Sequence, residues 1–146
     1  MRRFLLPLAL LALSACGGSD GSNASANSGS DTPSSSGSAG SQSWDPSAIT
    51  PSMVALGDSV FHGLKGATSC QACHGADGAQ ATVAPDLTDA TWLHNDGSWE
   101  GIYKTVKEGV MAPIEFTSVM PPDGGVPMPD DQRRAVAAYV YRLSHP

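Results

Sequence analysis

Two cysteines and a histidine form the most informative group of reactive side chains in this 146-residue chain. Cys70, Cys73 and His74 lie in the segment S-C-Q-A-C-H-G and follow the pattern C-x-x-C-H. Two residues between the thiols allow one turn of backbone to present both sulfurs to the two vinyl groups on one edge of a porphyrin. His74 is then placed to coordinate the iron from the proximal side. This spacing is the signature of covalent haem attachment, so it predicts one haem c with its iron.

Three other kinds of site could use the same cysteines. A thioredoxin-like redox pair usually lies in a βαβ context, and no strand pattern surrounds Cys70 and Cys73. A structural zinc site takes four ligands, and the fourth would have to be a distant histidine. The histidines available for this are His62, His94 and His145. A disulfide between the two cysteines would close a very short, strained loop, so the haem is the interpretation that the sequence favours.

The second axial ligand of such an iron must come from another part of the chain. Met120 is the best candidate, because the prolines of the Met-Pro-Pro sequence fix φ and reduce the entropy of holding a thioether toward the iron. Met128 stands in a second Met-Pro pair and is the main alternative, and Met111 is a minor one. The histidines considered for this position are His62 and His94, of which His94 is expected in a surface loop.

Three segments have the spacing of apolar residues that is typical of amphipathic helices. They cover residues 51 to about 62, 98–108 and 130–144. Thr50 and Pro51 form a good helix start, Gly109 is a natural C-terminal glycine, and Asp130 is expected to cap the last helix in place of Pro129. Gly- and Pro-rich loops join these segments. The sequence therefore predicts an all-α fold in which a haem supplies much of the apolar core.

In these motifs the chain resembles the class I c-type cytochromes, especially small domains related to cytochrome c5 and the haem subunits of terminal oxidases. The resemblance covers about residues 53–143. It rests on C-x-x-C-H, Gly78, A-P-D-L-T at 84–88, M-P-P-D-G-G at 120–125 and A-V-A-A-Y-V at 135–140. It implies a small cytochrome c fold wrapped around one covalently attached haem that transfers single electrons. The alternative is a gas-binding or catalytic haem domain with an open or labile sixth ligand.

The resemblance also implies roles for residues around the iron. The carbonyl of Pro85 would accept a hydrogen bond from the second ring nitrogen of His74, and Leu87 would touch the haem face. A His/Met iron has no open coordination site and a relatively high reduction potential, which suits an electron carrier and not an enzyme. The expected haem-binding residues are Cys70, Cys73, His74, Pro85, Leu87 and Met120, with His74 and Met120 as the iron ligands.

Further roles concern the helices and the haem propionates. Gly57, Phe61 and Tyr139 fit the positions at which the first and last helices of the family cross. Trp92 and Trp99 each carry an indole N–H that could reach a propionate, although a large aromatic in a small domain is more often a core residue.

The first 46 residues differ in composition from the rest of the chain. Residues 1–15 combine two arginines, an apolar stretch and small residues before Cys16, which is the layout of a secretory signal peptide. The sequence L-S-A-C at 13–16 resembles the bacterial lipobox, which implies a lipid on Cys16; an ordinary signal peptide is the alternative. Residues 16–46 are rich in Gly and Ser and predict a disordered linker. The cytochrome c domain is therefore expected at residues 47–146.

The chain is acidic, with 8 basic and 14 acidic side chains and a formal net charge of −6. This balance argues against nucleic acid or an anionic lipid surface as a partner. The N-terminal segment predicts an exported protein, held by its lipid at the periplasmic side of a membrane or at the cell surface. The expected partners are redox proteins or a membrane oxidoreductase complex.

Overall fold

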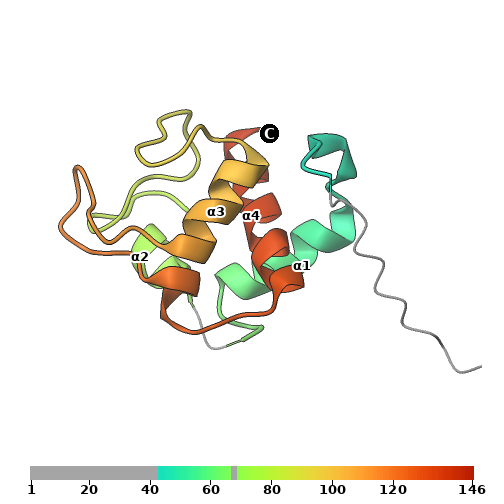
Figure 1. The fold of residues 1–146 in the computed structure, drawn as a ribbon, viewed down its shortest axis with the longest axis horizontal. Helices are drawn as coiled ribbons and strands as arrows, with labels where there is room; N and C mark the ends of the chain where they lie inside the picture. The colour runs from blue at the N-terminus through green and yellow to red at the C-terminus, as the bar shows by residue number, and fades with distance from the viewer. Residues whose placement is uncertain (1–42, 67–68) are drawn as a thin grey trace, which may run out of the picture. The chain divides into compact units, whose positions relative to one another are not determined.

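The computed structural model describes residues 43–66 and 69–146, which form helices joined by loops (Figure 1). The elements are η1 (Pro46–Ala48), α1 (Pro51–Phe61), α2 (Gln71–His74), α3 (Trp99–Glu108), η2 (Pro122–Gly125) and α4 (Asp130–Ser144). Within the described residues, extended pairing is limited to a single bridge between Val110 and Met120. The predicted all-α class is confirmed. No helix in this part of the chain is long and apolar enough to cross a membrane.

The N-terminal expectations fall mostly on residues that the structure does not describe. The signal peptide at 1–15, Cys16 and residues 17–42 of the linker lie outside the described residues. Just before the expected domain start at residue 47, Trp44 lies edge-on to Trp99, with ring centroids 5.3 Å apart. The Arg134 guanidinium lies 4.1 Å from the Trp44 ring centroid and donates a 3.0 Å hydrogen bond to the Ser43 carbonyl. Residues 43–44 are therefore packed on α3 and α4.

Polar side chains start α1 and α3 by satisfying backbone amides that have no partner inside the helix. The Thr50 hydroxyl accepts a 3.2 Å hydrogen bond from the Met53 amide, and Pro51 is the first residue of α1, as predicted. The Ser98 hydroxyl accepts a 3.0 Å bond from the Gly101 amide at the start of α3. These caps fix where the two helices begin.

The last helix starts without such a cap. Its N-cap residue is Pro129, and no side chain accepts a hydrogen bond there. Asp130 is instead the first residue of α4, so the expected capping by Asp130 is wrong. Its carboxylate accepts hydrogen bonds from the Tyr103 hydroxyl and from Arg133, because both donors lie within reach once α3 and α4 are packed together.

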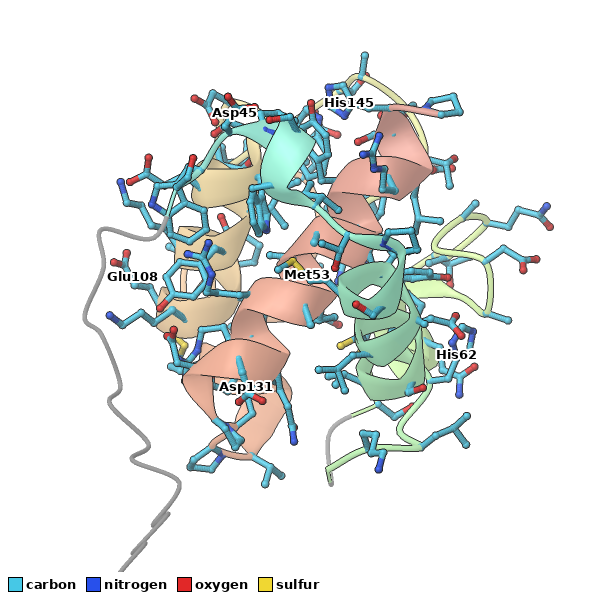
Figure 2. All side chains as sticks on the ribbon, turned by 90° about the vertical axis from the view of Figure 1, so that its right-hand side faces the viewer. Asp45, Met53, His62, Glu108, Asp131 and His145 are labelled. Atoms are coloured by element: carbon cyan, nitrogen blue, oxygen red, sulfur yellow. The ribbon has the colours of Figure 1, made fainter. Side chains whose placement is uncertain are left out.

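Direct contact between α1 and α4 organises the helical side of the molecule, and α4 lies between α1 and α3 (Figure 2). A Cβ at Gly57 would overlap the backbone carbonyl of Ala135, so only glycine allows this approach. Phe61 is fully buried, and its ring centroid lies 5.3 Å from that of Tyr139. The crossing predicted from Gly57, Phe61 and Tyr139 is therefore confirmed.

Two long loops lie on the other side of α3 from α1, at residues 75–98 and 109–121 (Figure 1). The core between the helices consists of Ile49, Val60, Phe61, Trp99, Ile102, Val106, Met128, Val136, Ala137, Ala138 and Val140. The loops contribute none of these buried residues. They must therefore be ordered by hydrogen bonds and by whatever fills the space that they enclose.

Candidate functional site

A large apolar cavity lies between α2, α3, α4 and the two long loops. Its empty space, with the open mouth and the solvent in it included, is about 1200 Å³. All six expected haem-binding residues line it, together with apolar side chains of the helices. The lining includes Phe61, Cys70, Cys73, His74, Pro85, Leu87, Trp92, Ile102, Val106, Met120, Val136 and Val140.

The helix α2 presents the two thiols and the imidazole to this cavity from a single turn. The His74 amide donates a 3.0 Å hydrogen bond to the Cys70 carbonyl, which closes the turn. Gly75 follows with φ 81°, a left-handed conformation that favours glycine. A Cβ at this position would also overlap the Ala79 carbonyl. The chain therefore leaves α2 sharply, and Cys70, Cys73 and His74 stay together at the cavity wall.

One hydrogen bond fixes the tautomer of His74. Its Nδ1 lies 3.1 Å from the Pro85 carbonyl oxygen, which can only accept, so Nδ1 carries the proton and Nε2 keeps its lone pair. Burial lowers the pKa of His74 and favours the neutral ring that metal binding requires. The Leu87 amide donates a 2.8 Å bond to the Gly78 carbonyl, which holds the Pro85 segment against the turn after α2. This is the arrangement that a proximal haem ligand needs.

The thiols do not have the character of a redox pair. Cys70 and Cys73 are both free, and burial raises the pKa of Cys70 to about 11. Reactive cysteines have lowered pKa values, because the thiolate is the nucleophile. Among residues 43–66 and 69–146, no group of three or more His, Cys, Asp or Glu side chains could hold a metal ion. The raised pKa of Cys70 disfavours the thiol-redox interpretation, while the donors fit a covalently held haem.

Of the three methionines considered as sixth ligand, Met120 alone lines the cavity. The backbone around it is rigid, because Met120 and Val110 exchange hydrogen bonds of 2.7 and 3.0 Å in both directions. Gly109 allows this pairing because the Met120 carbonyl lies where any other residue would have its Cβ. Met128 is buried in the core between the helices, and Met111 is 65% exposed.

Of the two histidines considered as sixth ligand, His94 lines the cavity and His62 does not. The ring nitrogens of His62 lie 2.9 Å from the carbonyl oxygens of Asp58 and Ala76, and His62 does not line the cavity. His94 lies in a loop, as expected, but it is half-buried and lines the cavity. In the loop 89–98, Asp89, Asn95 and Asp96 each accept a hydrogen bond from a backbone amide two residues on.

Trp92 and Trp99 have different surroundings in the structure. Trp99 is fully buried and donates its indole N–H to the Arg134 carbonyl at 3.1 Å. Its indole is therefore not free for a propionate, because the packing of α3 on α4 uses it. Trp92 is half-buried and lines the cavity, where the expected propionate contact stays a prediction.

Sequence reasoning did not single out several residues of the cavity wall. Phe116 and Val119 reach it from a loop that has no periodic pattern. Its large aromatic side chain, in a segment without helical or strand periodicity, was the signal available for Phe116. Ile102 and Val106 lie in the segment 98–108, whose apolar spacing predicts a helix, but only the packing shows that they border the cavity as well as the core.

A one-turn helix with paired thiols and an imidazole, beside an apolar cavity, defines a small helical haem-binding domain. The cytochrome c family model matches residues 54–144. The chain thus belongs to the cytochrome c family, and its cofactor is a covalently attached haem c.

Curated relatives of this chain are oxidase subunits. The cbb3-type cytochrome c oxidase subunit CcoP of Rubrivivax gelatinosus is 34% identical over 104 residues, which cover 71% of this chain and 30% of that protein. CcoP of Rhodobacter capsulatus is 39% identical over 71 residues (49% and 22%), and FixP of Sinorhizobium medicae is 43% identical over 65 residues (42% and 21%). The chain spans less than a third of the length of these relatives. No solved structure gives a significant match.

Proposed function

We propose that this protein is a single-haem electron carrier that passes one electron at a time between redox partners at the outer face of a bacterial membrane. The observation that carries the proposal is that His74, with Nδ1 bonded to the Pro85 carbonyl, and Met120 line the same apolar cavity. A neutral imidazole and a thioether are the axial pair that gives a relatively high reduction potential and leaves no open coordination site.

Each residue of the site then has a definite task. Cys70 and Cys73 would hold the haem through its two vinyl groups, and His74 would offer Nε2 to the iron. Met120 would offer its sulfur, and Leu87 would pack on the porphyrin. When bound, the haem would supply the iron that alternates between the ferric and ferrous states. The apolar lining would limit the access of water to the iron.

The mouth of the cavity supports docking of a protein partner. Val83 and Val119 line the cavity and remain 40% and 49% exposed. Removing Arg2 and Arg3 with the predicted signal peptide leaves 6 basic and 14 acidic side chains, or −8, in the mature chain. An apolar mouth on an acidic molecule favours a partner with an apolar patch bordered by basic groups.

The relatives suggest what that partner is. Because they are named as subunits of cbb3-type oxidases, we propose that this domain exchanges electrons with a membrane oxidoreductase complex. The predicted signal peptide and a lipid on Cys16 would hold it at the periplasmic side of a membrane or at the cell surface. Cys16→Ser is then expected to move the protein from the membrane fraction to the soluble fraction. Recovery of both forms in the soluble fraction would contradict the anchor.

The first experiment is the absorption spectrum of the mature protein from a host that matures c-type cytochromes. We expect sharp low-spin bands and, in the ferric form, a thioether-to-iron charge-transfer band. Met120→Ala should abolish this band, whereas Met128→Ala and His94→Ala should keep it. A high-spin spectrum and rapid binding of carbon monoxide by the native ferrous protein would favour a gas-binding or catalytic haem instead.

A further inference from the structure

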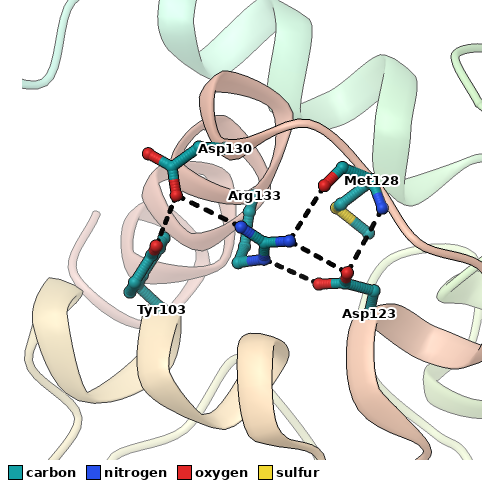
Figure 3. A network of polar contacts seen from close by, with 5 residues as sticks. All are labelled: Tyr103, Asp123, Met128, Asp130 and Arg133. Atoms are coloured by element: carbon teal, nitrogen blue, oxygen red, sulfur yellow. Dashed lines mark hydrogen bonds and ion pairs between the residues drawn. The ribbon is translucent and has the colours of Figure 1, made fainter.

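A buried ion pair joins η2, which follows Met120 in the chain, to α4. The Arg133 guanidinium donates two hydrogen bonds to the Asp123 carboxylate, from Nε to Oδ1 at 2.7 Å and from Nη2 to Oδ2 at 2.9 Å (Figure 3). The two side chains are only 13% and 11% exposed. Pairing with Arg133 lowers the pKa of Asp123. A bidentate pair with so little solvent contact is geometrically strict.

This Asp123–Arg133 pair joins two elements with different roles. Asp123 lies in η2, three residues after Met120, and Arg133 lies in the first turn of α4. Asp123 has φ 55°, a left-handed conformation that is unfavourable for a residue with a Cβ. Such a conformation persists only where the surroundings hold it. The ion pair helps to hold it, because the carboxylate meets the guanidinium in this conformation.

The same pair also locks Met128. The Met128 amide donates a 3.2 Å bond to Asp123 Oδ2, and its carbonyl accepts a 2.9 Å bond from Arg133 (Figure 3). Both polar backbone groups of Met128 are thus bound to the pair, and its side chain is 9% exposed in the core. The segment from Met120 to Met128 is therefore fixed at its start by Val110 and at its end by the Asp123–Arg133 pair.

We propose that the Asp123–Arg133 pair is a positioning device that holds the Met120 thioether at the haem iron and keeps Met128 away from it. The inference deepens the proposed function, on which it rests. Both methionines precede proline in the segment between α3 and α4, and the sequence favours Met120 only through the second proline that follows it. In the structure the ion pair separates them, because it binds both polar backbone groups of Met128 while the Met128 side chain lies in the core.

The test compares charge and geometry in the haem-loaded full chain. Asp123→Asn keeps an acceptor for the Met128 amide but removes the charge, whereas Arg133→Lys keeps the charge but removes the fork. The matched control is Glu100→Gln, which removes one negative charge from the surface pair Glu100–Lys104, 3.0 Å apart and 42% and 60% exposed.

The readouts report on the sixth ligand and not on stability alone. The apparent affinity for an external ligand rises with the fraction of molecules in which the thioether is released. We expect Asp123→Asn and Arg133→Lys to bind imidazole to the ferric iron at least about tenfold more tightly than the unaltered protein and to weaken the charge-transfer band. Glu100→Gln should stay within about twofold.

Nuclear magnetic resonance of the ferrous form identifies which methionine is bound, because the porphyrin ring current shifts the methyl signal of the bound thioether strongly upfield. The unaltered protein and Met128→Leu should show one such signal. Asp123→Asn should show a weaker signal or a second one, and Asp123→Asn/Met128→Leu should lose the second.

Unchanged imidazole affinity, band and methyl signal in variants that only unfold more easily would overturn the positioning role. If Asp123→Asn fails to fold, Arg133→Lys decides the question, since it preserves the charge balance. A failure of the proposed function is recognised separately, because the unaltered protein would then lack the charge-transfer band.

Discussion

The crossing of α1 and α4 and the loops around the cavity obtain their order in different ways. At the crossing, Gly57 lets two backbones meet directly, and Phe61 and Val60 are almost completely buried. The loops at 75–98 and 109–121 contribute none of the residues of the core between the helices and are held by a few backbone hydrogen bonds, from Leu87 to Gly78 and in both directions between Met120 and Val110.

The contrast shows how a small domain can combine stability with a tunable metal site. Packed helices resist change because every displaced atom meets another atom. Loops that enclose a cofactor depend on that cofactor for apolar contact, so few polar contacts decide where their ligands point. The stable half and the half that carries the chemistry can therefore be perturbed separately.

The largest expected effect comes from producing the chain without haem, through Cys70→Ala/Cys73→Ala. Amide hydrogens at 76–98 and 110–121 should exchange about a thousandfold faster than in the haem-loaded protein, because these segments lose the group on which they pack. Amides of α1 and α4 should keep part of their protection. Hydrogen exchange followed by mass spectrometry checks this. Equal loss of protection in both regions would abolish the distinction between them.

The second prediction perturbs the crossing. Gly57→Val should lower the free energy of unfolding by about 3 kcal/mol, because the new side chain has no room beside the Ala135 carbonyl. Ala55→Val, on the exposed side of the same helix, should change it by less than about 0.5 kcal/mol. Denaturant unfolding of the haem-loaded variants measures both. A normal haem spectrum in folded Gly57→Val would sharpen the comparison, and equal stability of the two variants would contradict it.

The smallest effect concerns His62, which links the two regions. A hydrogen bond to the Asp58 carbonyl, with the Ala76 carbonyl and the Asp58 carboxylate nearby, raises the pKa of His62. Only the imidazolium can donate to both carbonyls. The other groups that face this corner are the Tyr139 phenol and Asp77.

Because the folded-state pKa is the higher one, the contribution of His62 to stability is complete below its ordinary value of 6.5 and is lost as pH rises through the raised value. The unfolding midpoint of the haem-loaded protein minus that of His62→Gln should therefore fall as the pH rises above about 6.5. A difference that does not vary with pH, or that rises, would contradict the stabilising role of the charged His62 side chain.

The sequence by itself determined the features that depend on neighbours along the chain. The C-x-x-C-H spacing needs only one turn of backbone, and Thr50 and Gly109 mark helix ends because caps and left-handed glycines act within a few residues. The resemblance to the family implied the contact between Pro85 and His74, which the structure contains.

Only the tertiary structure decided which of several equivalent residues meet the cavity. Met120 and Met128 both precede proline, yet one lines the cavity and the other is bound to the Asp123–Arg133 pair. Trp92 and Trp99 differ in the same way, because the Arg134 carbonyl takes the Trp99 indole N–H across 35 residues of sequence. Burial and hydrogen-bond partners of this kind are set by the packing of distant segments, which local propensity and spacing do not encode.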